Sequence, residues 1–198
     1  MGYSYNKILN KLLSEVPINE SDSVYGITFV AGPGFGKSTV ANMLSKKLGL
    51  LIVANDQIRR VYDELGFDNT KYEDDIKKMA YDRTVYLLKN KTSHIVDANM
   101  QFYYQMAIDN YSKYNAKLYF IELKCNEEEI LKRIQVRERN FGKNDNQSRA
   151  TVEDYNRYLK LKEEKGIPDN LIFYTINTDT SIEEIEKKVD LLVDKLKK

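Results

Sequence analysis

The sequence predicts an α/β fold in which a five-stranded parallel sheet is flanked by helices. Three observations lead to this fold class. Short apolar runs alternate with segments of helical spacing along most of the 198 residues, a glycine-rich turn follows the first run, and polar residues stand directly after several runs. Strands separated by helices are typical of βαβ units, and therefore of a parallel sheet.

The first strand and the turn after it are the most specific part of the sequence. An apolar run over 24–30 predicts a buried strand, and residues 39–44 continue with helical spacing. Between them, AGPGFGKS at 31–38 matches the phosphate-loop pattern G-x-x-x-x-G-K-[ST], with Ala31 in place of the first glycine. A strand, a glycine-rich turn and a helix start are the context that this motif requires.

The chemistry expected of this loop is the binding of a polyphosphate. Glycines let consecutive backbone N–H groups converge on one concavity, and the helix N-terminus adds its positive end. Lys37 would reach the β- and γ-phosphates, and the Ser38 hydroxyl would bind Mg²⁺. The alternative is a glycine-rich strand–helix turn with a surface lysine.

The remainder of the chain supplies the other elements. Further strands are predicted at 50–53, 94–96, 116–123 and 171–176. Helices are predicted to start at Asn55, to run over about 72–88 and 103–114, and to start near Glu127, at Thr151 and at Ser181, with a short one before residue 22. Capping signatures mark the starts at Thr151 and Ser181.

Two carboxylates stand at predicted strand ends, at the edge of the sheet where the phosphate loop lies. Asp56 follows the second strand, and Arg59 shares its helix face three residues later. Asp56 could accept a hydroxyl proton during attack on a γ-phosphate, and Arg59 could hold an anionic group of the acceptor. The alternative is an N-cap aspartate beside a surface arginine.

Asp97 ends the third strand, where a carboxylate helps to hold Mg²⁺, usually through water. It could instead cap the next helix. Asn99 could orient a substrate or cap that helix.

Arginines on a later helix precede a polar, turn-rich segment. Arg133, Arg137 and Arg139 lie on or near one helical face, and residues 140–150 after them resemble a lid loop. The arginines could clamp transferring phosphates when the loop closes, or form a solvated charged face.

Composition limits the possible functions. The net charge of +1 shows no basic surplus, which weakens a polynucleotide substrate without excluding it. The one histidine, His94, allows no histidine-based triad or metal cluster. The one cysteine, Cys125, allows no internal disulfide and favours a reducing cytoplasm. No apolar run is long enough to span a membrane, and the N-terminus lacks the apolar core of a signal peptide.

Four blocks together resemble the polynucleotide-kinase-like P-loop kinases, a group that includes zeta-toxin-like and small-antibiotic kinases. They are 32–39 (GPGFGKST), 55–59 (NDQIR), 95–99 (IVDAN) and 133–137 (RIQVR). Their order matches the phosphate loop, D-x-x-R, strand-end D-x-N and lid R-x-x-x-R of the phage-type polynucleotide kinase domain. Departures include Phe35 in a usually small loop position and the absence of arginines at 100–105.

The resemblance implies a P-loop NTPase fold with a helical lid at about 138–151, in a kinase domain over 23–198 behind an N-terminal helical extension at 1–22. It implies that Asp56 is the general base, that Arg59 contacts the acceptor phosphate and that Asp97 is a structural or acceptor-side carboxylate; Asn99 is a further candidate for substrate binding. The implied ATP and transition-state contacts are Gly32, Pro33, Gly34, Phe35, Gly36, Lys37, Ser38, Thr39, Arg133 and Arg137, with Lys37 and Arg137 catalytic and Ser38 on the metal.

We therefore expect an ATP- and Mg²⁺-dependent kinase that phosphorylates a hydroxyl. A 5′-hydroxyl nucleic-acid end is slightly favoured as acceptor, because Arg59 would match a phosphate beside that hydroxyl. One alternative is a kinase for a sugar, nucleoside or antibiotic, as in the zeta-toxin type. The other is an ATP-binding switch module that transfers nothing.

Overall fold

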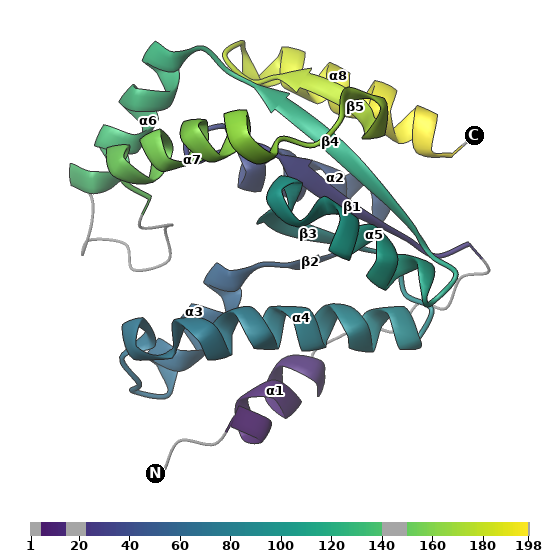
Figure 1. The fold of residues 1–198 in the computed structure, drawn as a ribbon. Coiled ribbons are helices and arrows are strands. Elements are labelled where there is room, and N and C mark those ends of the chain that lie inside the picture. Colours follow the sequence, from purple (N-terminus) through teal and green to yellow (C-terminus); the bar gives the residue numbers. More distant parts are fainter. Residues whose placement is uncertain (1–4, 15–22, 140–149, 198) are drawn as a thin grey trace.

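A computed structural model describes residues 5–14, 23–139 and 150–197 and places a five-stranded sheet at the centre of the protein (Figure 1). The strands are β1 (Tyr25–Val30), β2 (Leu51–Val53), β3 (His94–Asn99), β4 (Lys117–Lys124) and β5 (Ile172–Asn177). All pairs are parallel, in the order β2-β3-β1-β4-β5. The predicted fold class is confirmed.

The helices connect these strands close to the predicted positions. They are α1 (Tyr5–Ser14), α2 (Lys37–Leu48), α3 (Asn55–Glu64), α4 (Glu73–Lys89), α5 (Tyr104–Ser112), α6 (Glu127–Arg139), α7 (Val152–Lys165) and α8 (Ile182–Leu196). Short 3₁₀ turns, which the sequence analysis did not predict, precede α4, α5 and β5 at Asn69–Tyr72 (η1), Gln101–Tyr103 (η2) and Asp169–Leu171 (η3). Among the described helices, none has the length and apolar character needed to cross a membrane.

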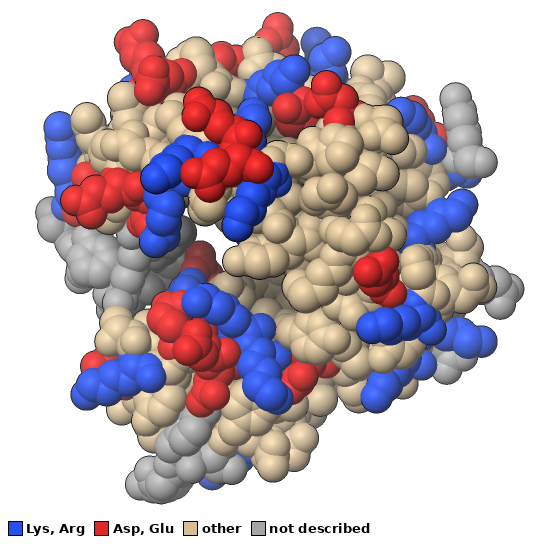
Figure 2. Space-filling view, in the orientation of Figure 1, with Lys and Arg blue, Asp and Glu red and all other residues tan. Residues whose placement is uncertain are grey.

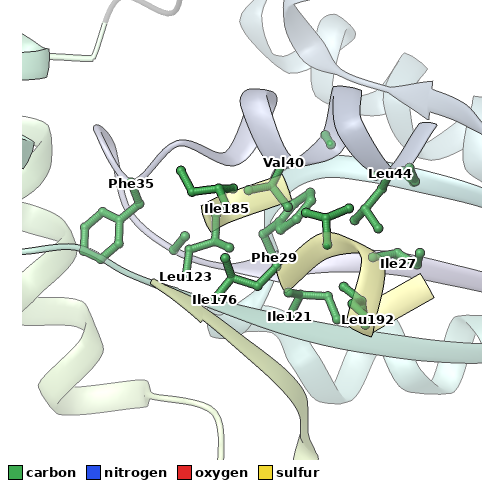
Figure 3. Packing of buried hydrophobic residues seen from close by; sticks show 14 of the residues in the cluster. Ile27, Phe29, Phe35, Val40, Leu44, Ile121, Leu123, Ile176, Ile185 and Leu192 are labelled. Atoms are coloured by element: carbon green, nitrogen blue, oxygen red, sulfur yellow. The ribbon is translucent and has the colours of Figure 1, made fainter. Parts of the chain in front are cut away.

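The main core lies between the sheet and the helices α2 and α8. Figure 3 shows Val40 and Leu44 of α2 and Leu192 of α8 packed against Phe29 and Ile121 of the central strands. Burial of each such side chain contributes roughly 1.5–3 kcal/mol, so this cluster fixes the sheet on which the strand-end residues stand. Helices α4 and α5 lie on the opposite side of the sheet (Figure 1).

Helix α1 packs against α3 and α4. Ile8 and Leu12 are buried in a second cluster with Ile58 and Tyr62 of α3, and the Tyr5 hydroxyl donates a hydrogen bond to Asp82 of α4 at 2.7 Å. The helix therefore covers the outer side of the α3–α4 pair, away from the strand ends. The expected boundary at residue 22 lies outside the described residues and stays a prediction.

Candidate active site

The phosphate loop follows β1, which lies in the middle of the sheet. Gly34 and Gly36 have positive φ angles of 82° and 86°, which residues with a side chain adopt only at a cost. A Cβ at Gly34 would also lie 2.9 Å from a methyl group of Ile130. Helix α2 starts directly after Gly36 and no side chain caps its first N–H groups. The loop thus has the backbone expected of an anion cradle.

Lys37 folds back over this loop. Its ammonium donates hydrogen bonds to the carbonyl oxygens of Gly32 at 2.6 Å and Ala31 at 3.3 Å. Burial lowers the pKa of Lys37 to about 8, while the nearby Asp97 carboxylate opposes this shift. Lys37 is therefore a buried cation, and keeping it charged costs free energy unless an anion lies beside it.

Asp97 is aimed at Ser38 by an irregularity in β3. Thr28 of β1 pairs with Val96 but Phe29 pairs with Asn99, so β3 carries two extra residues at 97 and 98. Bulges of this kind re-aim side chains near active sites. Burial raises the pKa of Asp97, while a hydrogen bond with Ser38 and the charge of Lys37 oppose this. Asp97 therefore lies inside β3 and does not cap the following helix.

Asp56 lies in the first turn of α3, and the N-cap residue is Ala54. Asp56 accepts a hydrogen bond of 2.7 Å from Arg59. Glu73, the first residue of α4, accepts two further bonds of 2.9 Å and one of 3.1 Å from the same guanidinium. The two carboxylates thus share Arg59, and Glu73 is a member of the site that the sequence analysis missed.

The two lid arginines have different surroundings. Arg137 faces the cavity described below. Arg133 donates to the carbonyl oxygens of Thr178 at 2.6 Å and Gly34 at 3.2 Å, and to Glu129 at 2.9 Å. Arg133 therefore supports the phosphate loop from outside. The expected lid falls largely at residues 140–149, outside the described residues.

Phe35 packs on neighbouring rings and does not line the cavity described below. Its ring centroid lies 5.5 Å from that of Tyr158 and 6.5 Å from that of Tyr155, both on α7. Its carbonyl oxygen accepts a hydrogen bond of 2.9 Å from the buried Thr178 hydroxyl. The sequence analysis missed Thr178. The signal that could have identified it is its position directly after the strand β5.

One cavity of about 520 Å³ joins most of these groups. Of the predicted site residues, those that line it are Pro33, Gly34, Gly36, Lys37, Ser38, Asp56, Arg59, Asp97, Asn99 and Arg137. The surface is hollowed there, beside a broad uncharged area (Figure 2). Gly32, Phe35, Thr39 and Arg133 are not among the lining residues. Asn99 lines the cavity and also accepts a hydrogen bond from the backbone N–H of Gln101, at 3.3 Å.

A buried pair lies at the far end of this cavity. The Nδ1 of His94 lies 3.0 Å from the Thr92 carbonyl oxygen, which can only accept, so Nδ1 carries the proton. Burial lowers the pKa of His94 to about 4, so the ring is neutral and its Nε2 accepts the Tyr111 hydroxyl at 2.6 Å. His94 therefore fixes the tyrosine that lines the cavity.

Comparison with known proteins supports the same fold. The chain resembles a putative kinase from Chloroflexus aurantiacus J-10-fl, with TM-score 0.61, 18% identity, and coverage of 88% of this chain and 97% of that one. It also resembles the Mycobacterium tuberculosis APS kinase CysC, solved with AMPPNP and APS, with TM-score 0.58 and 14% identity, over 90% of this chain and 100% of that one. A structure of the PezAT toxin–antitoxin system of Streptococcus pneumoniae is similar as well, with TM-score 0.63 and 14% identity, over 100% of this chain and 98% of that one.

Comparison of the sequence with protein-family models identifies the family of the chain. No curated protein matches the sequence significantly. The family model AAA_33, described as an AAA domain, matches residues 28–162, which include the phosphate loop, Asp56, Asp97 and both lid arginines. This match spans more than half of the chain. The protein therefore belongs to this AAA-domain family and has a P-loop NTPase fold of the kinase-like type.

Proposed function

We propose that the protein is an ATP-dependent kinase that transfers the γ-phosphate to a hydroxyl group of a small molecule. The observation that carries this proposal is the single cavity in which the phosphate loop, Asp56 and Arg137 meet. The same cavity continues between α4 and α5, so a nucleotide and an acceptor could lie end to end within it. Holding two reactants in line in this way is a large part of catalysis of phosphoryl transfer.

The loop from Gly32 to Thr39 would hold the ATP phosphates through its backbone N–H groups. Lys37 would exchange its carbonyl partners for phosphate oxygens, which restores a favourable environment for its buried charge. Arg137 would contact the transferring phosphate, whereas Arg133 would act by holding the Gly34 carbonyl and hence the loop.

The residues near Ser38 suit Mg²⁺. A hydroxyl and a carboxylate in hydrogen-bond contact offer the hard oxygen donors that this ion prefers. Among the described residues there is no group of three or more potential ligands from His, Cys, Asp and Glu, so phosphate oxygens and water would complete the shell. When bound, the ion would supply neutralisation of phosphate charge.

Asp56 is the proposed general base. It lines the cavity beside the loop, where it would take the proton of the acceptor hydroxyl as that oxygen bonds to the γ-phosphorus. The bond between the γ-phosphorus and the bridging oxygen then breaks, and ADP leaves with the bonding electrons. Arg59 would hold the Asp56 carboxylate in place, since its guanidinium is anchored by Glu73.

A 5′-hydroxyl nucleic-acid end is the second candidate acceptor, favoured by the presence of Arg59 in the cavity wall. Two observations weigh against it. Arg59 already contacts two carboxylates, and beyond it Lys77 is the one basic side chain among the described residues of the α4 and α5 walls. A nucleic-acid groove normally follows the backbone with several cations.

The test is phosphate transfer from γ-labelled ATP with Mg²⁺ to a 5′-hydroxyl oligonucleotide and, separately, to a panel of small alcohols. Asp56→Asn should lower the rate by roughly 100-fold or more, because proton removal contributes about that much. Asp194→Asn is the matched control, since Asp194 is exposed on α8 and does not line the cavity. Retained ATP binding without transfer to any acceptor would sink the kinase proposal and favour the switch module.

A further inference from the structure

The cavity extends well beyond the phosphate loop, into a part that we call the chamber. It lies between the Lys77–Leu88 face of α4 and the Tyr103–Tyr111 face of η2 and α5, with Leu118 of β4 behind them. Every third or fourth residue of α4 from Lys77 to Leu88 lines it, which is one face of the helix and a length of about 16 Å. The chamber is therefore a built feature of two helix faces.

The chamber walls are mainly apolar, and several polar groups among them are already bonded, including Asn110, whose Oδ1 accepts from the Tyr81 hydroxyl at 3.5 Å. Ala80, Val85, Leu88, Met106 and Ala107 supply aliphatic surface. The Thr84 hydroxyl donates to the Ala80 carbonyl at 3.0 Å, and that of Tyr111 bonds to His94 at 2.6 Å. Polar groups of a ligand would thus find few partners there, and burying them unpaired is costly.

The two ends of the chamber differ. At the inner end, Leu88 and Tyr111 belong to one buried cluster with Val24 and Ala116, which closes it. At the mouth, three large apolar side chains are unusually exposed: Tyr81 at 47%, Tyr103 at 63% and Met106 at 52%. Exposed apolar groups around a cavity are typical of a ligand site.

We infer that the acceptor carries, beyond its hydroxyl, an uncharged apolar body, such as an aromatic ring or a branched hydrocarbon, that is buried in the chamber. This inference rests on the proposed function, because only a hydroxyl placed next to Asp56 makes the ligand an acceptor. The cavity volume of about 520 Å³ lies within the range of small-molecule sites. A sugar or polyol would bury hydroxyls against walls that offer them few partners.

The test uses 2-(1-naphthyl)ethanol, a primary alcohol with an aromatic body, and xylitol as the polar counterpart. The sequence has no tryptophan, so naphthalene fluorescence can report binding to the full chain without nucleotide. We expect the naphthyl alcohol to bind and xylitol not to compete. Val85→Asn should weaken binding about tenfold, because it places an unpaired amide in the wall.

Met106→Gln is a second chamber variant, used in case Val85→Asn fails to fold. It should fold normally, since Met106 is half exposed and Gln has a similar shape. It should weaken binding about threefold or more. Leu191→Gln, at a residue of α8 that is 54% exposed and away from the cavity, should leave binding unchanged. Competition by xylitol, or equal binding by the wild type and both chamber variants, would overturn the inference.

A second readout separates this inference from the proposed function. Transfer from labelled MgATP to the bound naphthyl alcohol, lost in Asp56→Asn, would support both. Chamber-dependent binding of the alcohol would support the apolar chamber, and it would count against the kinase activity if no alcohol of the panel received phosphate. Transfer to xylitol in preference to the naphthyl alcohol would support the kinase and overturn the inference.

Discussion

Nucleotide binding is expected to weaken above about pH 8, because of Lys37. Burial lowers the pKa of its ammonium to about 8 in the free protein. A polyphosphate beside the ammonium favours the charged form and raises that pKa, so above pH 8 binding must take up a proton. Below pH 8 Lys37 is already charged, and it adds no pH dependence there.

The magnitude follows from the fraction of free protein in which Lys37 is neutral. The dissociation constant of MgATP should rise roughly 10-fold at pH 9 and roughly 30-fold at pH 9.5, relative to its value well below pH 8. The free energy of unfolding of the free protein should rise over the same pH range in which the affinity for MgATP falls. The unfolded chain holds this proton up to about pH 10.5, so Lys37 contributes stability that increases between pH 8 and 10.5.

The assay is titration of a fluorescent ATP analogue with Mg²⁺ between pH 6.5 and 9.5. Lys37→Arg is the control, because a guanidinium keeps its charge throughout this range. Its affinity should be lower at pH 7 but should vary little with pH. A wild-type dissociation constant that stays constant to pH 9.5 would refute the reasoning, since Lys37 would then be charged in the free protein.

Two further predictions concern the supports of the site. Glu73→Gln should lower the transfer rate about 3- to 10-fold with little change in MgATP affinity, because it loosens Arg59; Asp194→Asn, exposed on α8, should change neither in the same kinetic assay. Phe35→Ala should lower the free energy of unfolding by about 3 kcal/mol, measured by urea denaturation, because it removes a buried ring packed on Tyr158. An unchanged denaturation midpoint would contradict that role for Phe35.

The fold and the loop end of the candidate site were predictable because their signals are local. The phosphate loop is one continuous motif, and a residue directly after a strand lies at the carboxyl edge of a parallel sheet wherever the strand is placed. Asp56 and Asp97 were selected in this way, and both line the cavity, while their roles stay predictions. The capping signature at Thr151 was equally local and is confirmed, since its hydroxyl accepts from the Asp154 N–H.

The rest depends on contacts between segments far apart in the sequence. Glu73 reaches Arg59 only because α3 and α4 pack together, and its own position in an acidic first turn is typical of an ordinary helix start. Arg133 and Arg137 share a helix face, yet only the packing of α6 against the loop separates their environments. The apolar residues of α4 could not be divided between core and chamber by periodicity, which shows only that a face is apolar.

The local charge of the cavity bears on the acceptor more directly than the net charge of the chain. Among the described residues that line it, four are cations and two are carboxylates, and two of those cations, Arg59 and Lys77, already pair with Glu73 and Asp74 outside the cavity. Lys37 and Arg137 therefore remain to face the roughly two net negative charges that MgATP brings. An acceptor with phosphates of its own would add negative charge that no further cation in the walls offsets. A neutral alcohol leaves the balance intact, and the apolar chamber beyond Asp56 is the part of the cavity that could hold one.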